Sequence, residues 1–212
     1  MRVQVANLLV DVATYYAEKL AEHGDTPRGV DWNGEESQMI RFAQLCNIID
    51  PENPNFPLND LGCGYGALLD YLRDKHANCT YLGVDVSQEM IKVAEQRHAA
   101  VDQARFITEA EPDEVAHYGL ASGIFNVRLG RSDAEWFDYL QNTLDVLDRT
   151  SSLGFAFNCL TAYSDEEKKR YYLYYADPCQ LFDLCKRRYS RQVALLHDYG
   201  LYEFTVLVRN MH

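Results

Sequence analysis

Two aspartates flank a short run in which glycine occupies every second position. Asp60 comes two residues before the glycines Gly62, Gly64 and Gly66, and Asp85 follows at the distance expected of one β-α-β unit. Alternating glycines are typical of a turn that needs positive φ, or of bare backbone against which a ligand lies. We therefore expect a nucleotide-like ligand at this turn.

A strand, a turn and a helix must position these residues. Residues 57–61 are predicted to form a strand, and the apolar spacing after Ala67 predicts a helix. A second buried strand is predicted at 81–84, which leaves Asp85 at its carboxyl end. Ser87 is a good N-cap for the helix that follows. Both aspartates are therefore expected near the carboxyl ends of neighbouring strands.

The glycine spacing alone is compatible with two kinds of ligand. Gly62, Gly64 and Ala67 also satisfy the dinucleotide-binding pattern, in which the glycines approach a pyrophosphate. A nicotinamide-dependent oxidoreductase is therefore one alternative. It requires room for a second nucleotide, and a chain of 212 residues leaves little for a separate substrate domain.

The residues around the glycines carry a more specific signal. Residues 60–66 resemble the glycine motif of the class I S-adenosylmethionine-dependent methyltransferases, which is an acidic residue followed by three glycines at alternate positions. Residues 83–87 resemble the second acidic motif of the same family. The physical chemistry agrees, because S-adenosylmethionine has no pyrophosphate and offers a cationic amino group and a ribose diol instead. The resemblance implies an S-adenosylmethionine-dependent methyltransferase.

The resemblance also implies a role for individual residues. Asp60 would hold the amino group of the methionine moiety, and the three glycines would admit that moiety. Asp85, followed by Val86, would accept hydrogen bonds from the ribose hydroxyls, and Glu109 with Ala110 would meet the adenine amino group. The alternative is that the aspartates only cap turns and that Glu109 is a solvated loop residue.

The order of the predicted strands indicates an α/β fold. The chain is expected to form a seven-stranded, mostly parallel sheet with helices on both faces, a Rossmann-like methyltransferase fold. Family topology would make the last strand antiparallel and place the final turn at the cofactor end of the sheet. The strands after the second are predicted at 104–108, 120–125, 152–160, 193–197 and 202–208.

We divide the chain at residue 50. Residues 1–50 are predicted to form a helical extension that either covers the sheet or closes as a lid over cofactor and substrate, and residues 51–212 are predicted to form one compact methyltransferase domain. Trp32 lies in a loop of the extension. It is either a hydrophobic plug, which we favour, or part of a substrate wall.

Asn126 and Arg128 follow the predicted fourth strand, where open α/β sheets place their ligands. They are candidates for orienting a carboxylate or hydroxyl group of the substrate. Arg128 is equally well suited to pair with one of the many surface carboxylates.

Catalytic candidates lie in the last third of the chain. Tyr174 and Tyr175 belong to a long polar and aromatic insert at 161–177, which we interpret as a substrate wall, with plain packing as the alternative. His197 stands beside the final turn and is our candidate general base for a hydroxyl acceptor. A histidine satisfied by local hydrogen bonds is the simpler interpretation of His197.

Composition narrows the class of protein. The net charge of −12 argues against extended nucleic-acid binding, since phosphate contacts need clustered Lys and Arg. The six cysteines form no close pairs, so we expect neither a metal site nor disulfides, and reduced thiols in a cytoplasm fit best. No apolar run approaches the roughly 20 residues needed to span a bilayer. The sequence carries no signal for an oligomeric state.

We favour transfer of a methyl group to an oxygen or nitrogen of a small polar molecule. The acidic balance and the aromatic insert fit a compact, polar acceptor. A protein or peptide methyltransferase is the first alternative, and it requires an open groove instead of a closed pocket. The nicotinamide-dependent oxidoreductase is the second.

Overall fold

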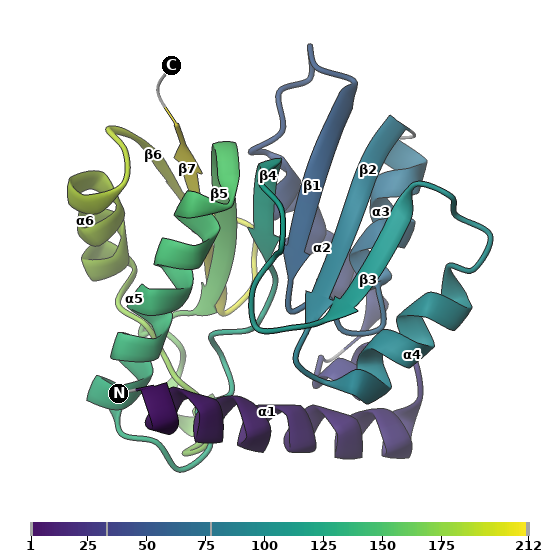
Figure 1. Cartoon of the computed structure of the whole chain (residues 1–212). Coiled ribbons are helices and arrows are strands. Elements are labelled where there is room, and N and C mark those ends of the chain that lie inside the picture. The colour runs from purple at the N-terminus through teal and green to yellow at the C-terminus, as the bar shows by residue number, and fades with distance from the viewer. Residues whose placement is uncertain (1, 33, 77, 211–212) are drawn as a thin grey trace.

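The computed structural model describes residues 2–32, 34–76 and 78–210, with side chains from residue 7 onward. Within these ranges one seven-stranded sheet forms the centre of the molecule (Figure 1). Its strands are β1 (Asn55–Leu61), β2 (Asn78–Asp85), β3 (Ala104–Thr108), β4 (Ala116–Ala121), β5 (Ser151–Leu160), β6 (Gln192–Leu196) and β7 (Glu203–Arg209).

The strand order is β3-β2-β1-β4-β5-β7-β6. All neighbours are parallel except β7, which runs antiparallel to both β5 and β6. The predicted α/β fold with a mostly parallel sheet is therefore confirmed. The order reverses between β1 and β4, and such a switch point opens a crevice at the carboxyl ends of the strands. Asp60 lies near the carboxyl end of β1, and Asp85 ends β2.

Helices cover both faces of the sheet and form two separate apolar layers. Residues from α2 (Glu35–Cys46), α3 (Ala67–Lys75) and α4 (Gln88–Arg97) pack in one layer. Residues from α5 (Asp133–Arg149) and α6 (Pro178–Arg188) pack in the other. The helix α5 begins with a capping box, in which Ser132 and Glu135 satisfy each other's backbone donors. Two short 3-10 helices, η1 (Pro27–Val30) and η2 (Glu166–Lys168), lie in connections.

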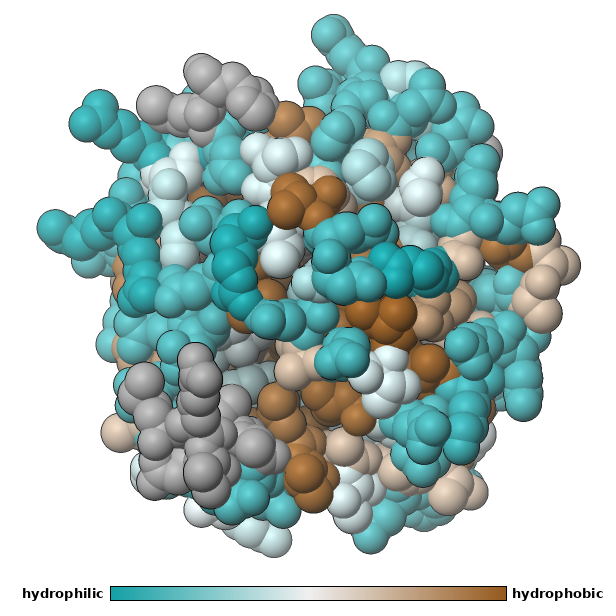
Figure 2. All heavy atoms as spheres, viewed as in Figure 1, coloured by the Kyte–Doolittle hydropathy of each residue, from teal (hydrophilic) through white to brown (hydrophobic). Residues whose placement is uncertain are grey.

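The first helix, α1 (Arg2–His23), differs from the others because it covers neither face of the sheet. It runs along the edge formed by the carboxyl ends of the strands (Figure 1). In the view of Figure 2, hydrophobic residues gather over the lower middle of the molecule, between α5 and α4, with hydrophilic residues around them. No helix in the described ranges combines the length and apolar character needed to cross a membrane. The division of the chain at residue 50 stays a prediction.

The fourth strand is displaced from its predicted position. It was expected at 120–125 and forms at 116–121, because residues 122–125 leave the sheet in a turn. Gly123 has a φ of 78°, and its N–H donates to the side chain of Asn158 at 2.7 Å instead of to a strand. Phe125 of this turn is buried and Ile124 is partly buried, which explains why these apolar residues resemble a strand in the sequence.

A buried ion pair joins the N-terminal helices to the last strand. Arg41 on α2 donates from Nε and Nη2 to both carboxylate oxygens of Glu203 on β7, at 2.7 and 2.6 Å. Arg41 is 7% exposed and Glu203 is 3% exposed. Asn158 donates a further hydrogen bond to Glu203 at 2.6 Å. This network fixes α2 to the sheet.

Removing one partner of this pair leaves a buried charge without its counter-ion. We expect Glu203→Gln to lower the free energy of unfolding by about 3–5 kcal/mol, because the guanidinium of Arg41 stays buried. The double variant Arg41→Met with Glu203→Met should lose less free energy of unfolding than the sum of the losses in the single variants Arg41→Met and Glu203→Met. Urea denaturation measures these values, with Glu18→Gln, exposed on α1, as the control. Strict additivity would contradict a coupled pair.

Candidate functional site

A cavity of about 750 Å³ lies at the carboxyl ends of the central strands. The glycine turn after β1 forms one wall, and residues of α1 and α5 face it. Its size is within the range of small-molecule and cofactor sites. We call it the first cavity. Of the predicted cofactor-binding residues, it is lined by Asp60, Gly62, Gly64, Asp85, Val86, Glu109 and Ala110.

Asp60 is the most unusual group in the first cavity. Its side chain is buried, with 2% of the residue exposed, and Oδ2 accepts a hydrogen bond from the Tyr81 hydroxyl at 2.5 Å. Oδ1 has no hydrogen-bond partner among the described residues. Burial raises the pKa of Asp60 to about 7, although the bond from Tyr81 lowers it in part. A buried carboxylate with one free oxygen is suited to a cationic group.

Asp85, at the end of the neighbouring strand β2, is held by backbone donors of the glycine turn and of its own loop. Its Oδ2 accepts from the N–H of Gly64 at 2.9 Å, and its Oδ1 accepts from the N–H of Ser87 at 2.8 Å. Burial raises the pKa of Asp85, and these bonds lower it in part. Each oxygen can accept a second hydrogen bond. The carboxylate is therefore fixed in place and still able to bind hydroxyl groups.

The three glycines of the turn all have positive φ, between 54° and 82°. Gly64 faces the first cavity, where a Cβ would stand 3.2 Å from Val30. Gly66 does not line the cavity, because it begins α3 against His98. A Cβ on Gly66 would lie 2.8 Å from His98 Nε2, which bonds the Gly66 carbonyl at 3.0 Å. Gly64 thus exposes backbone to a ligand, and Gly66 shapes the turn.

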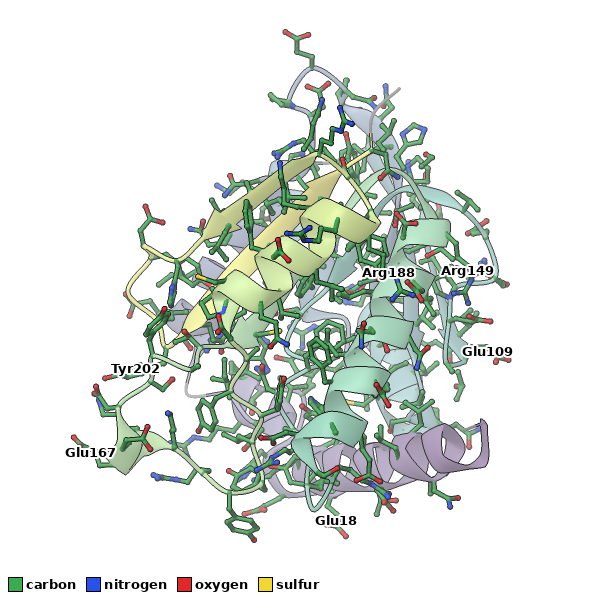
Figure 3. All side chains as sticks on the ribbon, turned by 90° about the vertical axis from the view of Figure 1, so that its left-hand side faces the viewer. Glu18, Glu109, Arg149, Glu167, Arg188 and Tyr202 are labelled. Atoms are coloured by element: carbon green, nitrogen blue, oxygen red, sulfur yellow. The ribbon has the colours of Figure 1, made fainter. Side chains whose placement is uncertain are left out.

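Glu109 lies at the rim of the first cavity. Its backbone N–H donates to the carbonyl of Asp85 at 3.1 Å, which fixes the end of β3 beside β2. Its side chain is exposed and points away from the protein (Figure 3). The carboxylate of Glu109 therefore contributes little to the enclosed part of the cavity, whereas Val86 and Ala110 line its wall.

A second cavity of about 620 Å³ adjoins the first. Val30 and Trp32 line both cavities. The ring of Trp32 lies under the guanidinium of Arg41, with 3.9 Å between the guanidinium carbon and the ring centroid. Trp32 is thus only partly buried and lines both cavities, and its contact with a substrate stays a prediction.

The structure brings only some of the predicted substrate and catalytic residues to the second cavity. Asn126 and Tyr175 line it. The Oδ1 of Asn126 already accepts from the N–H of Leu160 at 3.0 Å. The hydroxyl of Tyr175 accepts from the N–H of Arg170 at 2.9 Å.

Three other predicted residues line neither cavity, and each has a structural reason. Arg128 donates to Asp133 and to the carbonyls of three loop residues, so it ties the loop after β4 to the insert. Tyr174 is 9% exposed and belongs to the apolar core. His197 is exposed and packs against Tyr163 and Phe204, so this placement does not support a role as base.

Several cavity residues had no signal in the sequence. Gln38 on α2 is buried in the first cavity and donates to the hydroxyl of Tyr65 at 3.2 Å. Arg41, Lys168 and Arg170 line the second cavity. Lys168 and Arg170 belong to a short run of charged residues in the insert, to which no role was assigned from the sequence. Only the tertiary structure shows which side of that run faces a cavity.

Comparison with known proteins agrees with this geometry. Residues 59–152 match a family model described as a methyltransferase domain. A protein of Mycobacterium tuberculosis, Rv1506c, to which a methyltransferase activity is attributed, is 58% identical over 166 residues, which is 78% of this chain and 98% of that protein. The chain therefore belongs to the class I S-adenosylmethionine-dependent methyltransferases, as the glycine and acidic motifs predict.

Solved structures share the fold at low sequence identity. The N-methyltransferase NodS from Bradyrhizobium japonicum, in complex with S-adenosylhomocysteine, has a TM-score of 0.65 and 14% identity, over 94% of this chain and 98% of that one. DhpI, also in complex with S-adenosylhomocysteine, has a TM-score of 0.64 and 13% identity, over 97% of this chain and 98% of that one.

The raised pKa of Asp60 links stability to pH. Its pKa is about 7 in the folded protein against a usual value of 3.8, so the folded state keeps a proton that the unfolded state releases. The free energy of unfolding therefore falls as pH rises through this window, by roughly 4 kcal/mol for about 3 pKa units. Asp60→Asn cannot ionise and is expected to lack this loss.

Urea denaturation at several pH values from about 5 to 8 measures the effect. We expect the variant to gain stability relative to the parent as pH rises. Parallel pH profiles for the two proteins would show that Asp60 titrates normally.

Proposed function

We propose that this methyltransferase transfers a methyl group from S-adenosylmethionine to an oxygen or nitrogen of a small polar molecule. The observation that carries the proposal is the free Oδ1 of Asp60 in the first cavity, with Asp85 held at the end of the neighbouring strand β2. A cationic partner would stabilise a buried carboxylate oxygen that has no hydrogen bond, and the amino group of S-adenosylmethionine would be such a partner.

Three groups of the first cavity would hold the cofactor. Asp60 would bind the amino group, and the bare backbone at Gly64 would let the methionine moiety approach. Asp85 would accept from the ribose hydroxyls through its remaining lone pairs. Leu9, Val12 and Tyr16 of α1 would cover the ligand, because they line the same cavity.

Methyl transfer requires little chemistry from the protein. The methyl carbon of a sulfonium is already electrophilic, so the protein must align a nucleophile with the bond from carbon to sulfur and exclude water. A base is needed only for an acceptor that must lose a proton. Among the described residues, no histidine lines either cavity, which supports an acceptor that reacts without a histidine base.

The acceptor would occupy the second cavity. Val30 and Trp32 line both cavities, so the reacting atom of an acceptor there would reach the methyl group past these two side chains. A space of about 620 Å³ matches a small molecule better than a polypeptide segment. This favours the small-molecule function over the protein or peptide alternative.

Cofactor affinity tests the assignment of the two aspartates. We expect Asp60→Asn and Asp85→Asn each to weaken S-adenosylmethionine binding at least tenfold in isothermal titration calorimetry, because each removes a charge-assisted contact. Glu109→Gln, which changes an exposed side chain at the same rim, should alter the affinity less than threefold. An unchanged affinity in both aspartate variants would contradict the proposed site.

The pH dependence of binding is a separate test. Asp60 has a pKa of about 7 and must be ionised to hold a cation, so the affinity should fall below that pH. The amino group of the ligand must be protonated, and α-amino groups lose their proton near pH 8. We expect calorimetry to give the highest affinity between these two pH values. In Asp60→Asn we expect no fall in affinity on the acid side, the acid limb of the profile. A profile with an acid limb in that variant would assign it to another group.

A screen for the acceptor tests the reaction itself. The protein is incubated with S-adenosylmethionine and pooled small molecules, and the release of S-adenosylhomocysteine is measured. At least one small polar molecule should be methylated, and His197→Ala should keep that activity, since His197 lies outside both cavities. Methylation of peptide substrates alone would favour the protein methyltransferase.

A further inference from the structure

The two cavities differ in the sign of the charge that lines them. Carboxylates dominate the charged side chains of the first cavity, which are those of Asp60, Asp85, Glu109, Glu111, Asp145 and Arg149. The second cavity is lined by Arg41, Lys168 and Arg170 together with Asp31 and Glu203. In a chain with a net charge of −12, a cavity with more basic than acidic residues is not expected from composition.

Both carboxylates of the second cavity already have basic partners. Glu203 accepts two hydrogen bonds from Arg41. Asp31 lies 3.3 Å from the ammonium group of Lys19 and accepts from the hydroxyl of Tyr15 at 2.8 Å. Because these negative charges are compensated, the remaining basic side chains determine the charge that a ligand meets.

The remaining basic residues come from one segment, residues 165–170. Arg170 donates only to backbone carbonyls, those of Glu167 and Lys169 at 3.3 Å. Lys168 donates to the hydroxyl of Tyr202 at 2.9 Å and lies 3.7 Å from Asp165. Three acidic residues of the segment, at positions 165–167, do not line the cavity. Of the three basic residues of the segment, Lys168 and Arg170 line the cavity, and Lys169, which pairs with Glu166, does not.

The location agrees with a role in binding the acceptor. Figure 3 shows Glu167 and Tyr202 on the opposite side of the molecule from Glu109, which marks the rim of the first cavity. Tyr175 and Tyr202 also line the second cavity. Nη1 of Arg41, which lines it too, has no hydrogen-bond partner among the described residues. This guanidinium nitrogen and the hydroxyl of Tyr175 can donate to an anionic oxygen, whereas the hydroxyl of Tyr202 already donates to Asp165.

We propose that the second cavity recognises an oxyanion, a carboxylate or a phosphate, on the methyl acceptor, and that Lys168 and Arg170 hold it. The inference rests on the proposed function, because it names the class of acceptor for that reaction. Tyr175 and Tyr202 would contact the rest of the acceptor, and its reacting atom would reach the cofactor past Trp32, which lines both cavities. A basic cavity beside an acidic one also keeps the two ligands in their own sites.

The test uses ligands of the same shape and different charge. Benzoate, phenyl phosphate and the neutral benzamide are titrated by ligand-observed NMR, with and without saturating S-adenosylhomocysteine. The aromatic ring suits the tyrosines of the cavity. We expect at least one anion to bind at least tenfold more tightly than benzamide. A preference for phenyl phosphate identifies a phosphate on the acceptor, and a preference for benzoate identifies a carboxylate.

The double variant Lys168→Met with Arg170→Met tests whether the anion binds at these two side chains. It should weaken binding of the preferred anion at least tenfold and change benzamide binding less than twofold. The matched control, Lys75→Met with Lys92→Met, removes the same charge from exposed positions on α3 and α4 outside both cavities and should leave the anion affinity unchanged. Thermal unfolding confirms that both variants fold.

Two results would overturn the inference. The first is benzamide binding as tightly as both anions, and the second is an unchanged anion affinity in the double variant of Lys168 and Arg170. The proposed function fails separately, through absence of S-adenosylmethionine binding in the parent protein. The anions can still be compared with benzamide in the titrations that contain no S-adenosylhomocysteine. Failure of the proposed function and failure of the inference are therefore distinguishable.

Discussion

The burial of one carboxylate determines the rest of this structure. Asp60 lies at the end of a central parallel strand, where the sheet and its helices exclude water, and a single neighbour, the hydroxyl of Tyr81, bonds it. Ionised and alone, such a group destabilises the fold. A cationic ligand would restore the missing interaction. Under the proposed function, the same burial that destabilises the ionised carboxylate would therefore favour binding of a cofactor with a positive charge.

The rest of the site is arranged around this carboxylate by contacts between distant parts of the chain. The strand order places Asp85 next to it, and the helix α1 runs along the open edge above both. Arg41 and Glu203 join α2 to β7, and the guanidinium of Arg41 stacks on Trp32. Because Trp32 lines both cavities, the buried ion pair also fixes a side chain at the place where they adjoin.

The sequence predicted what depends on local pattern. The strand, turn and helix around Asp60 and the acidic residue after the next strand lie within about one β-α-β unit, so spacing was enough to place them in one cavity. The seven-stranded, mostly parallel sheet with an antiparallel last strand followed from the family resemblance and was confirmed. The bounds of β4 were wrong because buried apolar residues in a turn resemble a strand.

Prediction was weakest where distant residues meet. Arg41 and Glu203 are 162 positions apart, and no local pattern connects them. Lys168 and Arg170 had no assigned role, because the sequence does not show which side chains of the charged run at 165–170 line a cavity. His197 was expected near the chemistry, as part of a turn at the cofactor end. It follows the edge strand β6, which lies four places from β1 in the sheet, and its side chain is exposed.

The ionisation of Asp60 is the most direct test of this account. Carbon-13 NMR of the aspartate carboxyl groups, with Asp60→Asn used to assign the signal, gives its pKa with and without S-adenosylmethionine. The account predicts a pKa of about 7 in the free protein and a clear fall when the ligand binds. An ordinary aspartate pKa in the free protein, or a value that the ligand does not change, would contradict it.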